Sequence, residues 1–103
     1  LRPILKLQNP LLIEVFHNYI EKRKGVFYEL SLEKKLDYIE SSLIKDQKFR
    51  NSVKGMLIGH FTVAEYGIYK QQSSSLNKRM MNLVIERLKD QVQLLEVPLK
   101  KVV

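Results

Sequence analysis

The chain has 103 residues, which is typical of one domain, and its 45% hydrophobic and 28% charged residues exclude a disordered chain. It contains no Cys, which excludes disulfides, thiolate metal ligands and Cys nucleophiles and points to the cytoplasm. No apolar run approaches the roughly 20 residues that a membrane-spanning helix needs. We therefore expect residues 1–103 to form a single cytoplasmic domain.

The N-terminal segment predicts an apolar arm followed by a helix. Residues 1–8 read LRPILKLQ, and Asn9-Pro10 then combines a good capping residue with the residue preferred at the first helical position. We expect the helix to run from Pro10 to about Lys24. Gly25 can adopt the left-handed conformation that ends it.

Two more helix starts follow in the middle of the chain. Ser31 precedes apolar residues at helical spacing and predicts a helix that extends to about Lys45. Asp46 is a second capping residue, and we expect the helix that it begins to end near Gly59.

The last third of the chain opens with the strongest local signal for a helix start. The sequence after it allows two interpretations, a turn or a continuous helix. Thr62 and Glu65 have the spacing of a capping box. Residues 71–75, QQSSS, hold neither Gly nor Pro, and apolar residues keep one helical phase across them. A turn between two helices and one long helix from Thr62 to about Glu96 therefore both stay open. A Val-Pro pair then ends the helix and leaves a second apolar arm at residues 97–103.

These signals predict an all-α fold, a compact bundle of four to five helices with one long C-terminal helix as a variant. No segment of comparable length shows the alternation of a half-buried strand. In the final helix, between Leu76 and Leu95, the apolar arc covers roughly 200°, whereas a surface helix needs about 100°. The first helix is similar. Each wide face needs cover from two sides, so we expect a homodimer; the alternative is that both helices are central and the terminal arms cover them.

Arg87 interrupts the apolar arc of the final helix, and a buried Arg needs a carboxylate partner. We expect Arg87 to form an ion pair with Glu40 or Glu65 that fixes helix register, or to form a dimer contact. An anion or ligand site around Arg87 is the functional alternative. We expect His60, beside Thr62 at a helix junction, to be buried and hydrogen-bonded. The four candidates for a buried polar or ligand site are thus Arg87, Glu40, Glu65 and His60.

Ser52, Gly55 and Gly59 lie on one side of the third predicted helix. Each Gly inside a helix costs about 1 kcal/mol relative to Ala, which a close approach of another helix would offset. We therefore expect this face to pack closely, with a ligand against bare backbone as the alternative, and we expect Gly55→Leu to destabilise the fold.

The sequence offers no catalytic, metal or phosphate motif. Glu14 and His17 have the Glu-x-x-His spacing of di-iron bundles, but such a site needs a second motif, and we expect both residues on a solvated face. The Gly spacing fits neither a dinucleotide fingerprint nor a P-loop, and residues 73–75 lack the context of a Ser nucleophile. We predict no catalytic residue, no cofactor and no metal.

Six short segments between residues 1 and 96 resemble those of known proteins: LRPILKLQN at 1–9, KGVFY at 24–28, LDYIE at 36–40, FRNS at 49–52, GHFT at 59–62 and LNKRMMN at 76–82. The chain resembles a small uncharacterised family of bacterial proteins, some of which carry the label glyoxalase. Glyoxalases use His and Glu ligands on paired strand modules, or a His-rich metallo-β-lactamase motif. This chain has neither pattern, so the resemblance supplies no site residues.

We interpret the chain as a small helical protein–protein interaction or regulatory module that acts as a homodimer. A net charge of +7, from 18 Lys and Arg against 11 Asp and Glu, makes a basic nucleic-acid-binding protein the alternative. A small-molecule binder, or an enzyme such as the labelled glyoxalase, ranks below these.

Overall fold

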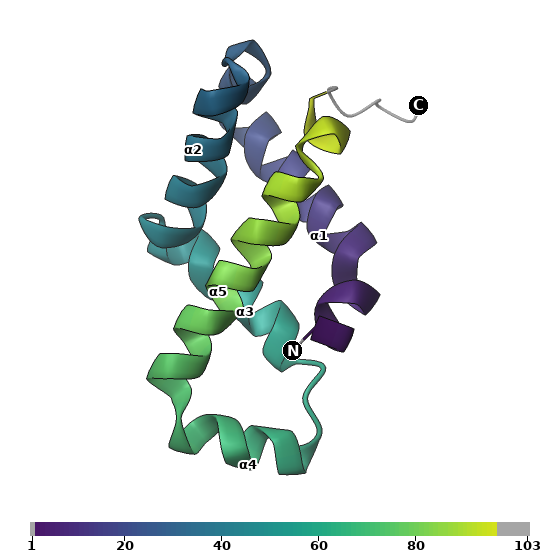
Figure 1. Ribbon diagram of the computed structural model, residues 1–103, viewed down its shortest axis with the longest axis vertical. Coiled ribbons are helices and arrows are strands. Elements are labelled where there is room, and N and C mark those ends of the chain that lie inside the picture. The colour runs from purple at the N-terminus through teal and green to yellow at the C-terminus, as the bar shows by residue number, and fades with distance from the viewer. Residues whose placement is uncertain (1, 97–103) are drawn as a thin grey trace.

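The computed structural model describes residues 2–96 and confirms the all-α prediction (Figure 1). The elements in chain order are α1 (Arg2–Lys22), the 3-10 turn η1 (Val26–Glu29), α2 (Leu32–Ile44), α3 (Gln47–Ile58), α4 (Val63–Gln71), α5 (Ser73–Asp90) and the 3-10 turn η2 (Val92–Leu95). Helix α5 packs against α1, α2, α3 and α4 and is therefore the centre of the bundle. Over residues 2–96, no helix has the length and apolar character needed to cross a bilayer.

Helix α1 starts eight residues earlier than the sequence predicted. The expected apolar arm of residues 1–8 is helical from Arg2, and Pro10 lies inside the helix rather than at its first position. Pro10 is exposed, so water can satisfy the Lys6 carbonyl that loses its helical hydrogen bond. Leu5 and Leu12, two turns apart, are both buried, and this burial extends the helix through the proline. The second predicted arm, residues 97–103, lies outside the described residues.

The predicted caps are confirmed for α2, α3 and α4. The side chains of Ser31 and Asp46 each accept a hydrogen bond from the backbone N–H three residues on, and Thr62 forms a complete capping box with Glu65. The end of α1 also follows the prediction, because Gly25 has a φ of 67°. These local signals fixed the helix boundaries because they need no partner from elsewhere in the chain.

A break separates α4 from α5 at Gln72, so the variant with one long helix is wrong. The chain turns sharply at this residue, and α4 lies across the lower end of the bundle in Figure 1. The Tyr69 hydroxyl donates a hydrogen bond of 2.6 Å to the side-chain oxygen of Asn77 and holds the two helices at this corner. Helix α5 ends at Asp90, and η2 follows it.

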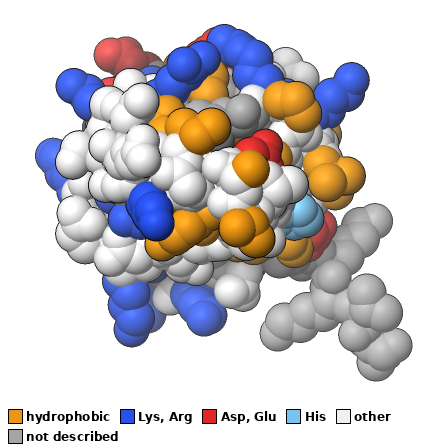
Figure 2. All heavy atoms as spheres, turned by 90° about the horizontal axis from the view of Figure 1, so that it is seen from below, with side chains coloured by type: hydrophobic (Ala, Val, Ile, Leu, Met, Phe, Trp, Pro, Cys, Tyr) orange, Lys and Arg blue, Asp and Glu red, His pale blue; other side chains and the backbone are white. Residues whose placement is uncertain are grey.

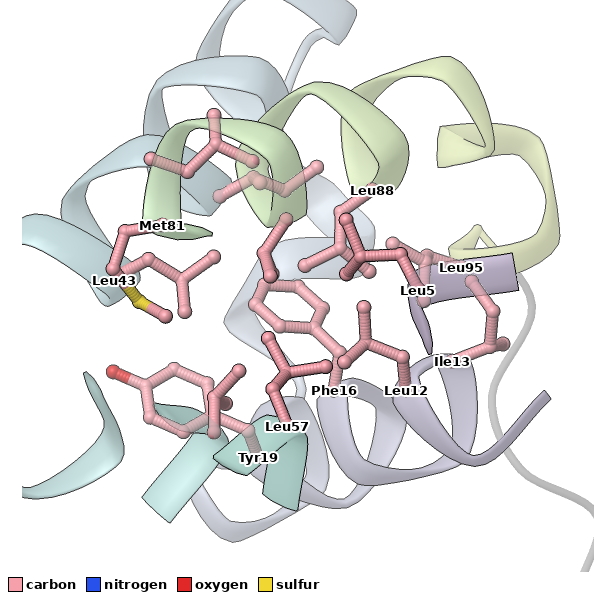
Figure 3. Close-up of a cluster of buried hydrophobic side chains, with 14 of the residues drawn as sticks. Leu5, Leu12, Ile13, Phe16, Tyr19, Leu43, Leu57, Met81, Leu88 and Leu95 are labelled. Atoms are coloured by element: carbon pink, nitrogen blue, oxygen red, sulfur yellow. The ribbon is translucent and has the colours of Figure 1, made fainter. Parts of the chain in front are cut away.

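The core lies between α1, α2, α3 and α5 (Figure 3). Phe16 of α1 points into its middle, toward Leu57 of α3 and residues of α5. The wide apolar arc of α5 is covered within the chain: Met80, Met81 and Val84 are all buried. Neighbouring helices provide this cover, and Ile4 and Leu5, from the segment predicted to be an arm, lie beside Leu76 and Leu83 of α5.

Candidate functional site

Arg87 is half-buried, and its neighbour is an amide rather than a carboxylate. Its guanidinium donates to the Asn9 side-chain oxygen at 3.4 Å. Asn9 and Gln91 also exchange two side-chain hydrogen bonds of 2.7 Å. Asn9 therefore does not cap a helix but joins α1 to the end of α5. Arg87 also lines a recess of about 80 Å³ together with Arg2, Glu86 and Asp90.

The other three polar candidates are not brought to Arg87. Glu40 pairs with Lys89 at 3.0 Å, and Glu65 accepts the backbone N–H of Thr62 at 2.7 Å within the capping box. His60 is exposed, not buried, and its ring hydrogen-bonds to the Gln8 side chain. The predicted ion pair of Arg87 with Glu40 or Glu65 does not form, because Glu40 pairs with Lys89, two residues further along α5, and Glu65 caps α4.

The face of Ser52, Gly55 and Gly59 is open to solvent, which corrects the prediction of close packing. A Cβ added at Gly55 would meet no atom within 4 Å. The reason is that Val53 and Leu57 turn the opposite side of α3 into the core.

His17 is buried, whereas the sequence predicted a solvated residue. Neither ring nitrogen has a hydrogen-bond partner among the described residues, and Glu14 is exposed. Within residues 2–96, no three His, Asp or Glu side chains come close enough together to hold a metal ion.

A polar cluster that the sequence analysis missed links α1 to the start of α3. Asp46 accepts hydrogen bonds from the Tyr19 hydroxyl at 2.9 Å and from Arg23 at 2.6 Å, and Arg23 lies 3.8 Å above the Tyr19 ring. The Phe49 N–H, then Tyr19 and Arg23, hold the pKa of Asp46 below its ordinary value. Burial, followed by the bond to Asp46, raises the pKa of Tyr19 to about 12. Because each charge in this cluster is already paired, we assign the cluster a structural role.

An apolar groove lies at the opposite end of the molecule, between helix α4 and the first turns of α1 and α5. Its cavity measures about 150 Å³. The groove is lined by Ile4, Phe61, Glu65, Ile68, Tyr69 and Leu76. The Phe61 and Tyr69 rings, which line the groove, pack edge to face with centroids 5.6 Å apart. Ile68, on its rim, is 61% exposed.

The groove continues as an apolar stripe on the outer side of α1. Ile4, Leu7 and Leu11 have the i, i+3, i+7 spacing of one helix face. Leu7 is 69% exposed and Leu11 is 51% exposed. We call Ile4, Leu7, Leu11 and Ile68, together with the groove, the apolar track. Its spacing is visible in the sequence, but it was missed because residues 1–8 were interpreted as an arm rather than a helix.

Charged residues of both signs lie near this track. Lys6 and Lys70 are exposed on α1 and α4, whereas Glu65 lines the groove and the exposed Glu14 follows Leu11 on the same face of α1. Arg2 lines a separate recess with Glu86 and Asp90. Figure 2 looks onto the end of the molecule that α4 covers, with apolar side chains across its middle and most Lys and Arg side chains toward its edges.

Comparison of the chain with protein-family models, with curated proteins and with solved structures finds no match.

Proposed function

We propose that this protein is a small interaction module that binds another polypeptide along the apolar track. The exposure of Leu7, Leu11 and Ile68 beside a preformed groove carries the proposal. Large apolar side chains that lie next to one another on an otherwise polar surface are typical of protein interaction sites. We place the module in the cytoplasm, as the absence of Cys suggests.

The character of the groove favours a polypeptide over a small metabolite. Sites for small molecules usually enclose about 300–1,000 Å³ and bring several polar groups together. The groove measures about 150 Å³, and the one carboxylate on its wall, Glu65, already serves the capping box of α4. A side chain of a partner protein fits such a recess better than a complete ligand.

The homodimer predicted from the sequence would use the same track, with α1 packing against α1 of a second copy. Light scattering after size-exclusion chromatography tests this assembly. A dimer that becomes monomeric in Leu11→Glu, and stays dimeric in the control Leu32→Glu, supports it. Leu32 is a suitable control because it is 57% exposed, as Leu11 is 51% exposed, but lies on α2, away from the track.

Position-specific photo-crosslinking in the cells that make the protein tests the proposed function. Benzoylphenylalanine replaces Ile68 in one variant, Leu7 in a second and Leu32 in a control. We expect the first two variants to form the same discrete adduct and the Leu32 variant not to form it. Adducts that are equally abundant at all three positions, or absent from positions 7 and 68, contradict the proposal.

The net charge of +7 favours nucleic-acid binding as a second candidate function. A duplex bound through phosphate contacts would dissociate steeply between low and moderate salt. The central positions of this surface are apolar, however, and α4 carries Lys70 as its only Lys or Arg. We therefore rank a protein partner first. A titration with a DNA duplex at two salt concentrations distinguishes the two candidate functions.

A further inference from the structure

We infer that a recess between the end of α1 and the start of α3 binds a small phosphorylated molecule. The recess measures about 360 Å³, and its lining includes the cations Lys22, Arg23 and Lys48. We call it the Arg23 recess. It lies at the end of the molecule away from the apolar track and shares no lining residue with it, so this inference goes beyond the proposed function and is tested separately.

The described lining of the Arg23 recess carries an excess of positive charge. Its three cations stand against the carboxylate of Asp46. Lys22 and Lys48 are exposed, and neither forms an ion pair within residues 2–96. Lys45 adds a fourth cation from a second recess, of about 330 Å³, which borders the same Arg23 side chain. The site therefore attracts an anion, and it attracts a doubly charged anion more strongly than a singly charged one.

The structural cluster around Asp46 holds Arg23 in place for such a contact. Arg23 donates to Asp46 at 2.6 Å, and its guanidinium lies 3.8 Å from the centroid of the Tyr19 ring. Asp46 is itself fixed by the Tyr19 hydroxyl at 2.9 Å and by the Phe49 N–H at 3.2 Å. A guanidinium has five N–H donors, so donors remain for a ligand, and the Arg23 side chain is 46% exposed. Because Arg23 is already ordered, binding phosphate oxygens costs it little further conformational entropy.

The rest of the Arg23 recess offers contacts to an organic group. Tyr19 and Phe49 both line it, and their ring centroids are 4.0 Å apart. The hydroxyl of Ser52, which is exposed on α3, can donate or accept a hydrogen bond. The volume of about 360 Å³ lies within the range of about 300–1,000 Å³ that is typical of sites for small molecules. A phosphate ester of a small organic molecule therefore uses both the cations and the aromatic wall, whereas inorganic phosphate uses the cations alone.

A long polyanion fits this surface less well than a compact one. Asp37 and Glu40 line the next recess along α2, which shares Lys45 with the second recess. Glu21 precedes Lys22 on α1. A nucleic acid that extended beyond the four cations toward α2 would place its phosphates beside carboxylates, which repel them. The charge distribution therefore favours a ligand whose negative charge is confined to one group.

Titration of the isotope-labelled full chain with phenyl phosphate tests the inference, with the NMR shifts of the backbone amides as the readout. Benzoate has the same ring with one negative charge, benzyl alcohol has the ring with none, and inorganic phosphate has no ring. We expect phenyl phosphate to cause saturable shifts in residues 19–23 and 45–52. We also expect it to bind at least about threefold more tightly than each of the three control ligands, because only phenyl phosphate combines a double negative charge with an aromatic group.

Two matched double variants place that binding on the Arg23 recess. Lys22→Gln with Lys48→Gln removes two cations from the recess and should weaken the binding of phenyl phosphate by about fivefold or more. Lys70→Gln with Lys78→Gln removes the same charge from α4 and α5, at the other end of the molecule, and should weaken it less than about twofold, because solvent and salt screen distant charges. All four lysines are exposed, so we expect both variants to fold, and circular dichroism confirms it.

A variant that keeps the charge tests the shape of the recess. Ser52→Leu places a larger side chain in the lining and should weaken phenyl phosphate several-fold by excluding its ring. Asn51→Leu is the control, because Asn51 is exposed on the same turn of α3 but does not line the recess. Its affinity for phenyl phosphate should equal that of the wild type.

Several results would overturn the inference. Equal weakening in the two double variants would mean that phenyl phosphate responds to the net charge of the protein and not to this recess. Shifts that do not saturate, or that lie mainly outside residues 19–23 and 45–52, would remove the site. Benzoate that binds as tightly as phenyl phosphate contradicts a phosphate ligand, and inorganic phosphate that binds as tightly contradicts an organic one. A DNA duplex that binds through Lys22 and Lys48, while phenyl phosphate does not bind, replaces the small ligand by a nucleic acid.

Discussion

The two ends of this molecule are built in opposite ways. At the end where α1 meets η1, α2 and α3, the rings of Phe16, Tyr19, Phe27, Tyr38 and Phe49 pack on one another, with Tyr19 and Phe49 centroids 4.0 Å apart. At the other end, Tyr69 is the one buried residue of α4, and Val63 is 92% exposed.

The contrast indicates where stability and where binding reside. Stacked aromatic side chains contribute large buried areas, so the aromatic end holds much of the folding free energy. Helix α4 depends instead on its capping box and on the Tyr69–Asn77 hydrogen bond. Its exposed side chains are therefore free to contact a partner without a loss of core packing.

The largest effect is expected at the aromatic end. Phe16→Ala should lower the free energy of unfolding by about 3–5 kcal/mol, because it removes a buried ring and leaves a cavity. Urea unfolding followed by circular dichroism measures the loss. The matched variant at the other end is Tyr66→Ala, which should cost less than about 1 kcal/mol because the side chain is half-exposed. Equal losses would remove the distinction between the two ends.

Asp46→Ala should cost about 2 kcal/mol, because it removes the α3 cap and the acceptor for Tyr19 and Arg23. The pKa of Asp46 is lower in the folded protein than its ordinary value, so its stabilisation is present above about pH 4 and is lost as the pH falls through the folded pKa. Urea unfolding at pH 7 and at pH 3 should thus show a smaller difference between wild type and variant at pH 3. The exposed Asp37→Ala serves as the control, and a difference that grows on acidification would contradict the assignment.

Thr62→Ala should cost about 1 kcal/mol, because it removes the capping box that holds α4 at its first turn. Hydrogen exchange followed residue by residue should show faster exchange in residues 63–71 and little change around Phe16. Thr62→Ser keeps the hydroxyl acceptor and should restore most of the protection. Uniform loss of protection over the chain would mean that α4 unfolds only with the aromatic end.

The smallest expected effect is a gain in stability at Gly55, in α3. Gly55→Ala should raise the free energy of unfolding by about 0.5–1 kcal/mol, because an exposed helical glycine costs backbone entropy and the new methyl group meets open space. Thermal unfolding measures the shift. The contrasting variant is Gly25→Ala, which should destabilise the fold, since Gly25 has a φ of 67° and its Cβ would lie 3.1 Å from the Tyr28 ring. If Gly55→Ala instead lowers the free energy of unfolding, this face of α3 packs closely, as the sequence predicted.

The sequence by itself determined the helix boundaries that short-range chemistry sets. Ser31, Asp46 and Thr62 each find the N–H that they cap within three residues, and Gly25 needs no partner to adopt a positive φ. These features were therefore readable without knowledge of the fold.

Tertiary structure decided what depends on residues far apart in the chain. Pro10 stays inside α1 because Leu5 reaches the core, and Arg87 meets Asn9 because the end of α5 lies against α1. The apolar track became visible only when residues 2–8 proved helical and Phe61, Ile68 and Leu76 closed around Ile4. A single sequence gives the spacing along one helix, but which faces meet depends on the burial free energy of the entire bundle.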